Sequence, residues 1–333
     1  MKNFLITFAV SILIFGIIAF AIVSIALGAF SSGVTQNPEN PIPQTEPIDN
    51  KKNPSGALSK SFNFLFINVD YRPDLYDDYV YDAGKKLGFD EGESTALPSY
   101  ENTRLPLVLS ALLVSVDGTK NRVMFSEIPT ETRLKLNGKN ISLSEYLYRE
   151  GNNAFCDAIR NLTGLDIDYF ALFTPSGLAN VVDALGGINF NVPCEMLFLT
   201  NDEEAPVYTV HSGEQLLSGK DAALMLTYND YADGNSYKLR VKTEFAKAVF
   251  AAFVTNIEKE KAVDFYTEQK GNFITDFATS DFAEDLDLLY TYENQEKAVV
   301  TYPGGETTVD GVKYFEPSTI SAHEDYSEYK FVG

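Results

Sequence analysis

An acid and a base follow an apolar run early in the folded part of the chain. Residues 62–69 are strongly apolar and predict a β-strand, which leads into the turn Asp70-Tyr71-Arg72-Pro73. Open α/β sheets bind their ligands outside the carboxyl ends of their strands, so Asp70 and Arg72 are candidate ligand-binding residues. Structural roles are the alternative: Asp70 as the cap of a turn, and Arg72 in a surface ion pair within an acidic chain.

The segment 166–193 is predicted to fold as a strand, a helix and a second strand. Residues 169–173 are apolar, and Thr174-Pro175 supplies an N-cap oxygen followed by a proline at the first helical position. Gly186-Gly187 permits a left-handed helix end. Residues 188–192 then alternate apolar side chains with amides, which predicts a strand that is half buried.

Other elements are predicted from apolar runs, capping signals and helical spacing. They are a hairpin of strands at 108–116 and 122–128, helices at 142–149, 153–162, 219–227 and 239–254, a short helix from Thr279, a strand near 298–302, and turns at Gly304-Gly305 and Asp310-Gly311. The predicted fold is α/β or α+β, with a central mixed sheet and helices on both faces.

The N-terminal part differs in composition from the rest of the chain. Residues 4–30 contain no charge and are long enough, at about 1.5 Å per residue, to cross a hydrocarbon core of about 30 Å. We expect residues 1–30 to be an uncleaved single-pass anchor, although small residues near Ala29 leave cleavage open. Residues 31–60 are rich in Pro and Asn and predict an extended linker. Residues 61–333 are then expected to form an extracytoplasmic domain held at the membrane by this anchor.

The net charge, the cysteines and the histidines limit the partners and metal sites that the chain could have. The formal net charge is −21, which argues against nucleic acid as a partner, because binding along a duplex needs clustered Lys and Arg. Cys156 and Cys194 are either two buried thiols or one disulfide. His211 and His323 have no second histidine or cysteine at metal-ligand spacing, so neither predicts a metal site.

Several blocks taken together resemble the LytR-CpsA-Psr family of bacterial envelope proteins. In order along the chain they are NFLFINVDYRP, LLVSVD with its hairpin into FSEIP, LTGLDIDYF, LANVVDALGGINFNVP, GEQLLSGKDAALML and VTYPGGETTVDGVKYF. The resemblance implies an α-β-α domain with a long apolar pocket for a polyprenyl chain. It also implies a phosphotransferase that moves a glycopolymer from a polyprenyl pyrophosphate to the cell wall, with arginines and Mg²⁺ neutralising the pyrophosphate.

The chain departs from the family's pattern at most of the implied catalytic positions. The residues at the substituted positions are Leu107, Leu109, Thr130, Glu131, Tyr228, Asp230, Thr243 and Glu244. Of the implied metal-binding acids Asp70 alone remains, and Glu131, which has no paired base, is interpreted as a solvated acid rather than a general base. The remaining candidates for binding a pyrophosphate are Asp70, Arg72, Arg104, Arg133 and Arg240.

Three functions follow from this pattern. The first is a catalytically degenerate family member that binds or organises a polyprenyl-linked glycopolymer intermediate, or an envelope protein. The second is an active ligase that uses Arg72, Arg104, Arg133 and Arg240 around Asp70, with Mg²⁺ as its cofactor. The third is a protein-interaction module whose pocket is closed by its own side chains.

Overall fold

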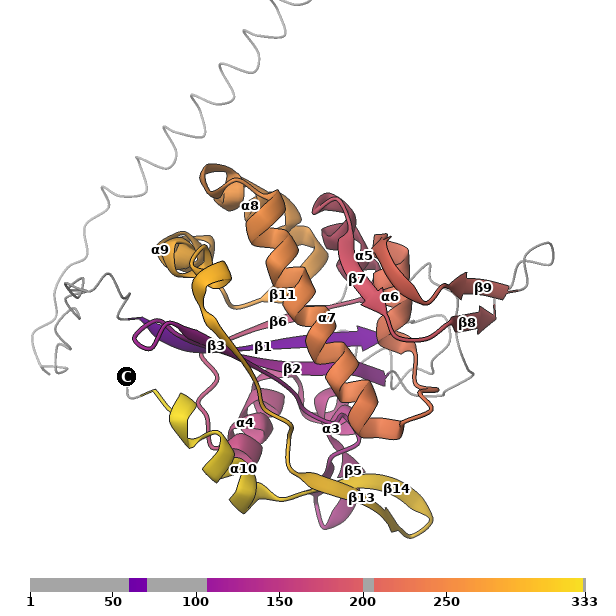
Figure 1. Ribbon diagram of the computed structural model, residues 1–333. Helices are drawn as coiled ribbons and strands as arrows, with labels where there is room; N and C mark the ends of the chain where they lie inside the picture. The colour runs from indigo at the N-terminus through magenta and orange to yellow at the C-terminus, as the bar shows by residue number, and fades with distance from the viewer. Residues whose placement is uncertain (1–59, 71–106, 200–206, 332–333) are drawn as a thin grey trace, which may run out of the picture. The chain divides into compact units, whose positions relative to one another are not determined.

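The computed structural model describes residues 60–70, 107–199 and 207–331 (Figure 1). The predicted anchor and linker, Arg72 and Arg104 lie outside the described residues, as does the side chain of Leu107. None of the helices in the described part of the chain combines the length and apolarity needed to cross a bilayer.

A six-stranded mixed sheet forms the centre of the domain, in the order β11-β6-β1-β2-β3-β12. The strands are β1 (Ser61–Asp70), β2 (Leu107–Asp117), β3 (Arg122–Glu127), β6 (Tyr169–Phe173), β11 (Phe273–Thr275) and β12 (Glu296–Val299). β1 is antiparallel to β2 and parallel to β6, and β12 is parallel to β3. The predicted mixed sheet is therefore confirmed.

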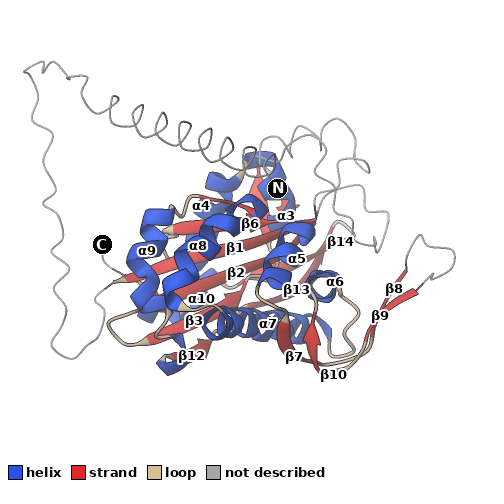
Figure 2. Cartoon of the chain, turned by 90° about the horizontal axis from the view of Figure 1, so that it is seen from above, coloured by secondary structure: helices blue, strands red, loops and turns tan. Residues whose placement is uncertain are grey.

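Helices cover both faces of the sheet (Figures 1 and 2). On one face lie α5 (Pro175–Ala184), α6 (Gly219–Thr227), α7 (Gly234–Asn256), α8 (Ala262–Gln269) and α9 (Thr279–Leu289). On the other lie α3 (Leu143–Glu150), α4 (Asn152–Thr163) and α10 (Thr319–Asp325). We call these the α7 face and the α4 face.

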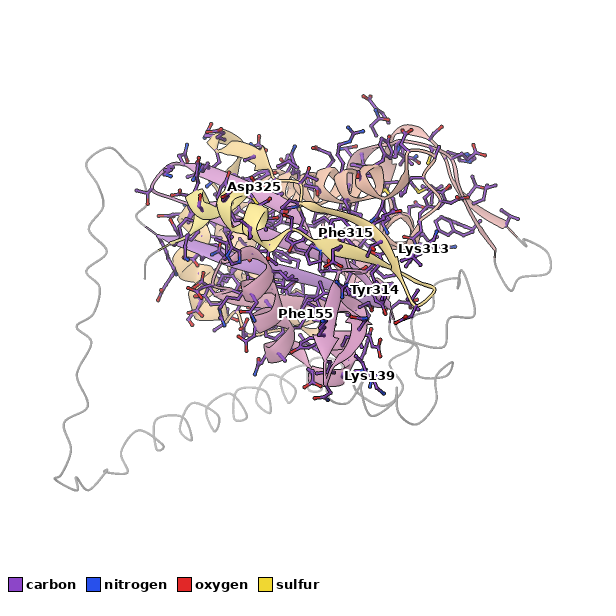
Figure 3. All side chains as sticks on the ribbon, turned by 90° about the horizontal axis from the view of Figure 1, so that it is seen from below. Lys139, Phe155, Lys313, Tyr314, Phe315 and Asp325 are labelled. Atoms are coloured by element: carbon purple, nitrogen blue, oxygen red, sulfur yellow. The ribbon has the colours of Figure 1, made fainter. Side chains whose placement is uncertain are left out.

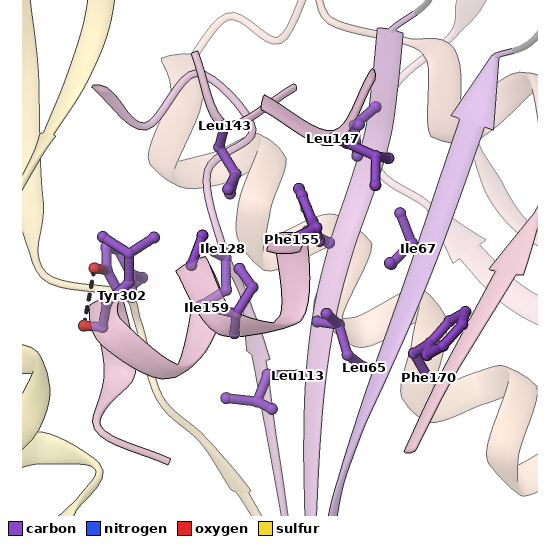
Figure 4. Packing of buried hydrophobic residues seen from close by; sticks show 14 of the residues in the cluster. Leu65, Ile67, Leu113, Ile128, Leu143, Leu147, Phe155, Ile159, Phe170 and Tyr302 are labelled. Carbon is purple, nitrogen blue, oxygen red and sulfur yellow. Dashed lines mark hydrogen bonds between the residues drawn. The ribbon is translucent and has the colours of Figure 1, made fainter. Parts of the chain in front are cut away.

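Alternation along β1 explains why both faces need cover. Phe62 and Phe64 are buried with the aromatic residues of α7 to α9, while Leu65 and Ile67 are buried with α3 and α4. A strand buried on both faces is apolar almost without interruption, as this one is. Figure 4 shows the α4 face, where Phe155 packs against β1 and β2.

Short elements flank the sheet. They are β4 (Arg133–Leu136) with β5 (Lys139–Ser142), β7 (Ile188–Val192) with β10 (Gly213–Leu217), β8 (Met196–Leu199) with β9 (Val207–Val210), β13 (Gly304–Val309) with β14 (Val312–Pro317), and 3-10 turns at Lys259–Lys261, Lys270–Asn272, Tyr292–Asn294 and Ser327–Tyr329. Tyr314 and Phe315, labelled in Figure 3, attach β14 to the β4–β5 hairpin: Tyr314 Oη donates to the Asn140 carbonyl at 3.3 Å.

Most predicted elements are confirmed, including the caps. Ser142 Oγ accepts from the Glu145 N–H at 3.0 Å, and Thr174 Oγ1 accepts from the Gly177 N–H at 3.1 Å. Cys156 and Cys194 are both free thiols and both half buried, and burial raises the pKa of Cys156 to about 12. The disulfide alternative is therefore not formed.

One predicted turn is wrong, and two predicted ranges shift. Gly304-Gly305 begins strand β13 instead of a turn, because both glycines pair with β14. A Cβ at Gly304 would lie 2.4 Å from the Glu316 carbonyl oxygen of that strand. Glycine is needed there for close approach of two strands. The strand predicted near 298–302 is Glu296–Val299, and α7 begins five residues earlier than predicted, at Gly234.

Close packing of α5 against α6 gives a stability prediction. A Cβ at Gly219 would lie 2.0 Å from the Ala179 carbonyl oxygen. We expect Gly219→Ala to lower the free energy of unfolding by about 2 kcal/mol, since the helices must move apart. Urea unfolding measures this. Gly271→Ala is the control, because a Cβ there meets nothing within 4 Å; equal stability of both variants would contradict the prediction.

Candidate functional site

An apolar cavity of about 240 Å³ lies between the α7 face of the sheet and the helices α7, α8 and α9. Aromatic side chains from the sheet and from these helices supply much of its wall. Six of them are Phe64, Phe66, Phe250, Phe253, Phe277 and Phe282. An apolar cavity with few polar groups is the usual form of a lipid or small-molecule site, although about 240 Å³ is below the usual range of about 300–1,000 Å³.

Polar residues line this cavity near the carboxyl end of β1. Asn68 on β1 pairs directly with Ser110 on β2, and Lys242 of α7 lies over the same end of the sheet. The Oδ1 atom of Asn68 is buried and has no hydrogen-bond partner within the described ranges. A buried polar atom without a partner is uncommon in proteins, so a ligand group is expected to meet it.

Lys242 is the most unusual residue of this end of the cavity. Its side chain is 6% exposed, and its ammonium group donates a hydrogen bond to the Leu109 carbonyl oxygen. Burial lowers the pKa of Lys242 to about 8, and the nearby Glu127 carboxylate opposes this shift only in part. A lysine buried with so little compensation is typical of a functional site.

Glu127 lies beneath Lys242 at the end of β3. Its carboxylate accepts hydrogen bonds from Ser110 Oγ at 2.9 Å and from the Ala111 N–H at 3.1 Å. Burial raises the pKa of Glu127, while the Lys242 charge and these two hydrogen bonds act in the other direction. The carboxylate therefore holds Ser110 and balances the buried cation.

A second, more polar cavity of about 200 Å³ adjoins the first, and Lys242 and Leu226 line both. Lys238, one helical turn before Lys242, places its Nζ atom 3.0 Å from Glu131 Oε1. Burial of Glu131 works against its charge, but the Lys238 ammonium group keeps the pKa of Glu131 below its usual value. We call this second space the polar pocket.

Charged side chains of both signs line the polar pocket within the described residues. They are the bases Arg149, Lys238 and Lys242 and the acids Glu131 and Glu145. Glu127 interacts electrostatically with Lys242 and Lys238 without lining the pocket. Arg149 and Glu145 form an ion pair along α3, and Lys238 pairs with Glu131. The arrangement places hydrogen-bond donors over an apolar cavity without a large excess of positive charge.

The comparisons with known proteins identify the family. A family model described as the LytR_cpsA_psr family matches residues 102–330, which is more than half of the 333-residue chain. The chain belongs to the LytR-CpsA-Psr family. A similar protein from Staphylococcus aureus (strain NCTC 8325 / PS 47), described as uncharacterized, is 22% identical over 326 residues, which cover 96% of this chain and 73% of the relative.

Solved structures with the same fold agree with this assignment. Protein gbs0355 from Streptococcus agalactiae has a TM-score of 0.63 and 17% identity, covering 82% of this chain and 90% of that one. TagV from B. subtilis has a TM-score of 0.60 and 17% identity, covering 81% and 96%. TagT bound to LIIa-WTA has a TM-score of 0.59 and 13% identity, covering 86% and 93%. These likenesses show the fold of the LytR-CpsA-Psr family member described here.

Arg133 and Arg240, the two described arginines among the predicted pyrophosphate ligands, lie apart in this family member. Arg133 of β4 forms a two-pronged ion pair with Glu316 of β14 and also donates to Asn140, at 3.0 Å. Arg240 packs over the Tyr237 ring at 4.8 Å and lines a separate groove of about 820 Å³. Neither lines the apolar cavity or the polar pocket.

Asp70 lies buried at the end of β1, where it is paired with Leu107 of β2 in the strand register. It lines neither the apolar cavity nor the polar pocket. Within the described ranges no group of three or more His, Cys, Asp or Glu side chains could hold a metal ion. Of the metal-binding acids implied by the family resemblance the described ranges hold Asp70 alone, so no chemical step is derived through a divalent metal.

The substituted family positions separate into two groups. Leu109, Thr130 and Glu131 all line the polar pocket. The other substituted positions whose side chains are described lie elsewhere. Tyr228 packs edge-on against Tyr231, Asp230 is exposed, Thr243 Oγ1 donates to the Leu239 carbonyl at 2.9 Å, and Glu244 pairs with Lys247.

Sequence reasoning missed Lys238, Lys242 and Glu127. The signal for both lysines was present: positions 238, 241, 242 and 245 share one helical stripe, so the lysines had to face inward with Val241 and Phe245. A charged residue on the buried stripe of a helix is the observation that would have located the site.

Proposed function

We propose that this LytR-CpsA-Psr protein binds a polyprenyl-linked glycopolymer intermediate of the bacterial cell envelope and holds it without transferring the polymer. One observation carries the proposal: the apolar cavity and the polar pocket, which is lined by bases and acids, share Lys242 in their walls. A polyprenyl chain fits the apolar cavity, and a polar head group fits the polar pocket. TagT, which shares the fold, has been solved bound to LIIa-WTA, and this supports a related ligand here.

Absence of transfer is inferred from the charges. Phosphoryl transfer depends on positioning and on stabilising negative charge with cations. Arg133 and Arg240 lie outside both spaces, and among the described residues Glu131 and Glu145 lie beside the three bases of the polar pocket, with Glu127 close to Lys242. The active-ligase alternative needs these arginines to converge around Asp70, and their placement disfavours it.

The location proposed for the protein follows from its sequence. Residues 1–30 would anchor it in the cytoplasmic membrane, and residues 31–60 would tether the domain outside the cell. An anchored domain receives a lipid-linked ligand directly from the bilayer. The 240 Å³ cavity is small for a long chain, so α8 and α9 would move outward as the chain enters.

Filling the apolar cavity tests the proposal. Ala246 of α7 lines the apolar cavity, whereas Ala248, two residues later, lines the separate groove that contains Arg240. With the full chain in lipid nanodiscs, we expect Ala246→Phe to weaken binding of a fluorescent polyprenyl probe by about tenfold, which corresponds to about 1.4 kcal/mol. Ala248→Phe is the matched control and should bind the probe as the wild type does. Equal binding by all three proteins would contradict an occupied cavity.

The claim that no transfer occurs has its own test. The wild-type chain is incubated with a polyprenyl pyrophosphate-linked sugar, peptidoglycan and Mg²⁺, and release of the polyprenyl carrier is measured. We expect no release above that of a protein-free sample. Magnesium-dependent turnover would overturn this part of the proposal while leaving lipid binding in place.

A further inference from the structure

A groove of about 820 Å³ lies along α7, on a stripe of this helix that does not line the apolar cavity. The α7 stripe, from Tyr237 to Ala251, forms one wall, and residues 189–193, at the end of β7, form another. Figure 2 shows β7 and β10 beside α7. We propose that this groove binds an extended peptide of a partner protein, which adds to β7 as a further strand and places a carboxylate at Arg240. The inference does not depend on the proposed lipid binding.

The groove follows the edge of β7. Side chains alternate between the two faces of a strand, so a groove beside one face would be lined by every second residue. Here the consecutive residues 189–193 all line the groove. From the paired strand β10, Gly213 at its first position is the described residue that does so. The groove therefore lies along the edge of β7 that faces away from β10.

The backbone of this edge is available for pairing. Within the described ranges β7 pairs with β10 alone, and residues 188–192 make no backbone hydrogen bond besides those of this pairing. A strand with one neighbour leaves the N–H and C=O groups of its other edge without ladder partners. An extended peptide that adds a strand supplies these partners, and this is a common mode of peptide recognition.

The length of the groove fits a short peptide. The α7 stripe from Tyr237 to Ala251 spans about 21 Å at about 1.5 Å per residue. An extended peptide rises about 3.3 Å per residue, so six residues span about 20 Å. Asn189 and Asn191 are exposed along the same path and can orient the side chains of the peptide.

Arg240 indicates the charge of the peptide. Its guanidinium group stacks on a tyrosine ring and has no hydrogen bond or ion pair with another described residue. The other bases of the groove are engaged: Lys247 pairs with Glu244 at 2.8 Å, and Lys297 donates to backbone carbonyl oxygens. Arginine binds carboxylates with two parallel hydrogen bonds. Because Glu244 and Glu293 also line the groove, the peptide is expected to carry one acid at Arg240 and not a run of acids.

Synthetic hexapeptides test the strand addition, with the full chain in lipid nanodiscs. The set alternates valine and threonine and carries one glutamate at each position in turn, and fluorescence anisotropy measures binding. In an added strand every second N–H faces β7. For the tightest peptide we expect N-methylation of one alternate set of amides to weaken binding more than about tenfold, and N-methylation of the other set to change it less than about threefold. Equal binding by both methylated peptides, or binding by none of the set, would overturn the inference.

Variants of α7 locate the peptide in the groove. Ala248→Phe fills the groove and should weaken peptide binding by about tenfold, whereas Ala246→Phe fills the apolar cavity and should bind the peptide as the wild type does. This is the reverse of their expected effects on the polyprenyl probe. Arg240→Ala should weaken the glutamate peptide by about tenfold and leave its glutamine version unchanged.

Three results would contradict the peptide assignment. The first is an equal effect of Ala246→Phe and Ala248→Phe on peptide binding. The second is an equal loss of the glutamate and glutamine peptides in Arg240→Ala, which would mean that no carboxylate meets this arginine. The third is tighter binding of an oligogalacturonate that displaces the peptide, which would assign the groove to an acidic glycan. Each of these leaves the proposed lipid binding standing, because the polyprenyl probe reports on the apolar cavity.

Discussion

Replacing Lys242 by methionine is expected to raise the free energy of unfolding at pH 7 by about 2–3 kcal/mol while weakening retention of the lipid. Burial lowers the pKa of Lys242 to about 8, against about 10.4 for an unfolded chain. The charged form of Lys242 therefore destabilises the folded state relative to the unfolded chain. Methionine fills a similar volume without charge. A residue that reduces stability and is nevertheless present is expected to serve binding.

The pH dependence of this effect has a definite sign. Between pH 8 and about pH 10.4 the unfolded wild-type chain binds more protons at Lys242 than the folded chain does, so wild-type stability rises with pH across this window. The methionine variant lacks the group. The difference in free energy of unfolding between the methionine variant and the wild type should therefore be largest below pH 8 and close to zero near pH 10.4. Glu127, Glu131 and Lys238 face Lys242 in both proteins, and the pKa of Glu127, already raised by burial, rises further when the Lys242 charge is removed.

Urea unfolding of both proteins from pH 6 to 10.5 measures the effect. Arg240→Ala is the control on the same helix, because Arg240 lies over the Tyr237 ring in the separate groove. That variant should show no such pH-dependent difference and should retain the polyprenyl probe. A methionine variant that is less stable at pH 7 than at pH 10 relative to the wild type would contradict the burial argument.

Local chemistry in the sequence predicts most of the fold. The caps at Ser142 and Thr174 and the hairpin between β2 and β3 depend on neighbours a few residues away, and they form as expected. Strand pairings between residues far apart in the sequence could not be predicted from local chemistry. Gly304-Gly305 has the composition of a turn, and only the close approach of β14 explains why the two glycines lie in a strand.

Asp70, Arg133 and Arg240, the described residues among those predicted to bind a pyrophosphate, do not line the two cavities of the candidate site. Leu109, Thr130 and Glu131 do come together at the carboxyl end of the sheet. The cations that meet them are lysines of α7, and they were missed because arginines were sought at spacings implied by the family. Arg133 and Arg240 could not be excluded from sequence, since the direction of a side chain depends on which face of its element packs inward.

Removing Lys60 is the second change with a large expected effect. Lys60 Nζ lies 2.6 Å from Asp285 Oδ1 of α9, and the Asp285 side chain is only 1% exposed, whereas that of Lys60 is 33% exposed. Lys60→Met leaves a buried carboxylate without its counter-ion, which is expected to lower the free energy of unfolding at pH 7 by about 3 kcal/mol. Asp285→Asn leaves an ammonium group that reaches water, so its effect should be much smaller.

The consequence for the cavity follows from the position of α9. Phe282 and Leu288 of α9 line the apolar cavity, and Phe282 stacks on Tyr266 of α8 with ring centroids 4.4 Å apart. The ion pair thus ties the first described residue of the domain to a wall that would have to move when a lipid chain enters. Weakening it should raise amide hydrogen exchange in α9 while leaving α3, on the opposite face, unchanged.

Acid titration distinguishes the loss of the Lys60–Asp285 ion pair from a general loss of stability. Burial raises the pKa of Asp285, and the Lys60 charge opposes the shift. The stability that Asp285 contributes is therefore present at low pH and is lost as the pH rises through the pKa of Asp285 in the folded protein. Removing Lys60 raises this folded-state pKa further. The difference between the wild type and Lys60→Met should vanish below about pH 4, where the carboxyl is protonated in both folded proteins, and should open as pH rises. A difference that stays constant from pH 3.5 to 7 would mean that the lysine stem, and not its charge on Asp285, holds α9 against the sheet.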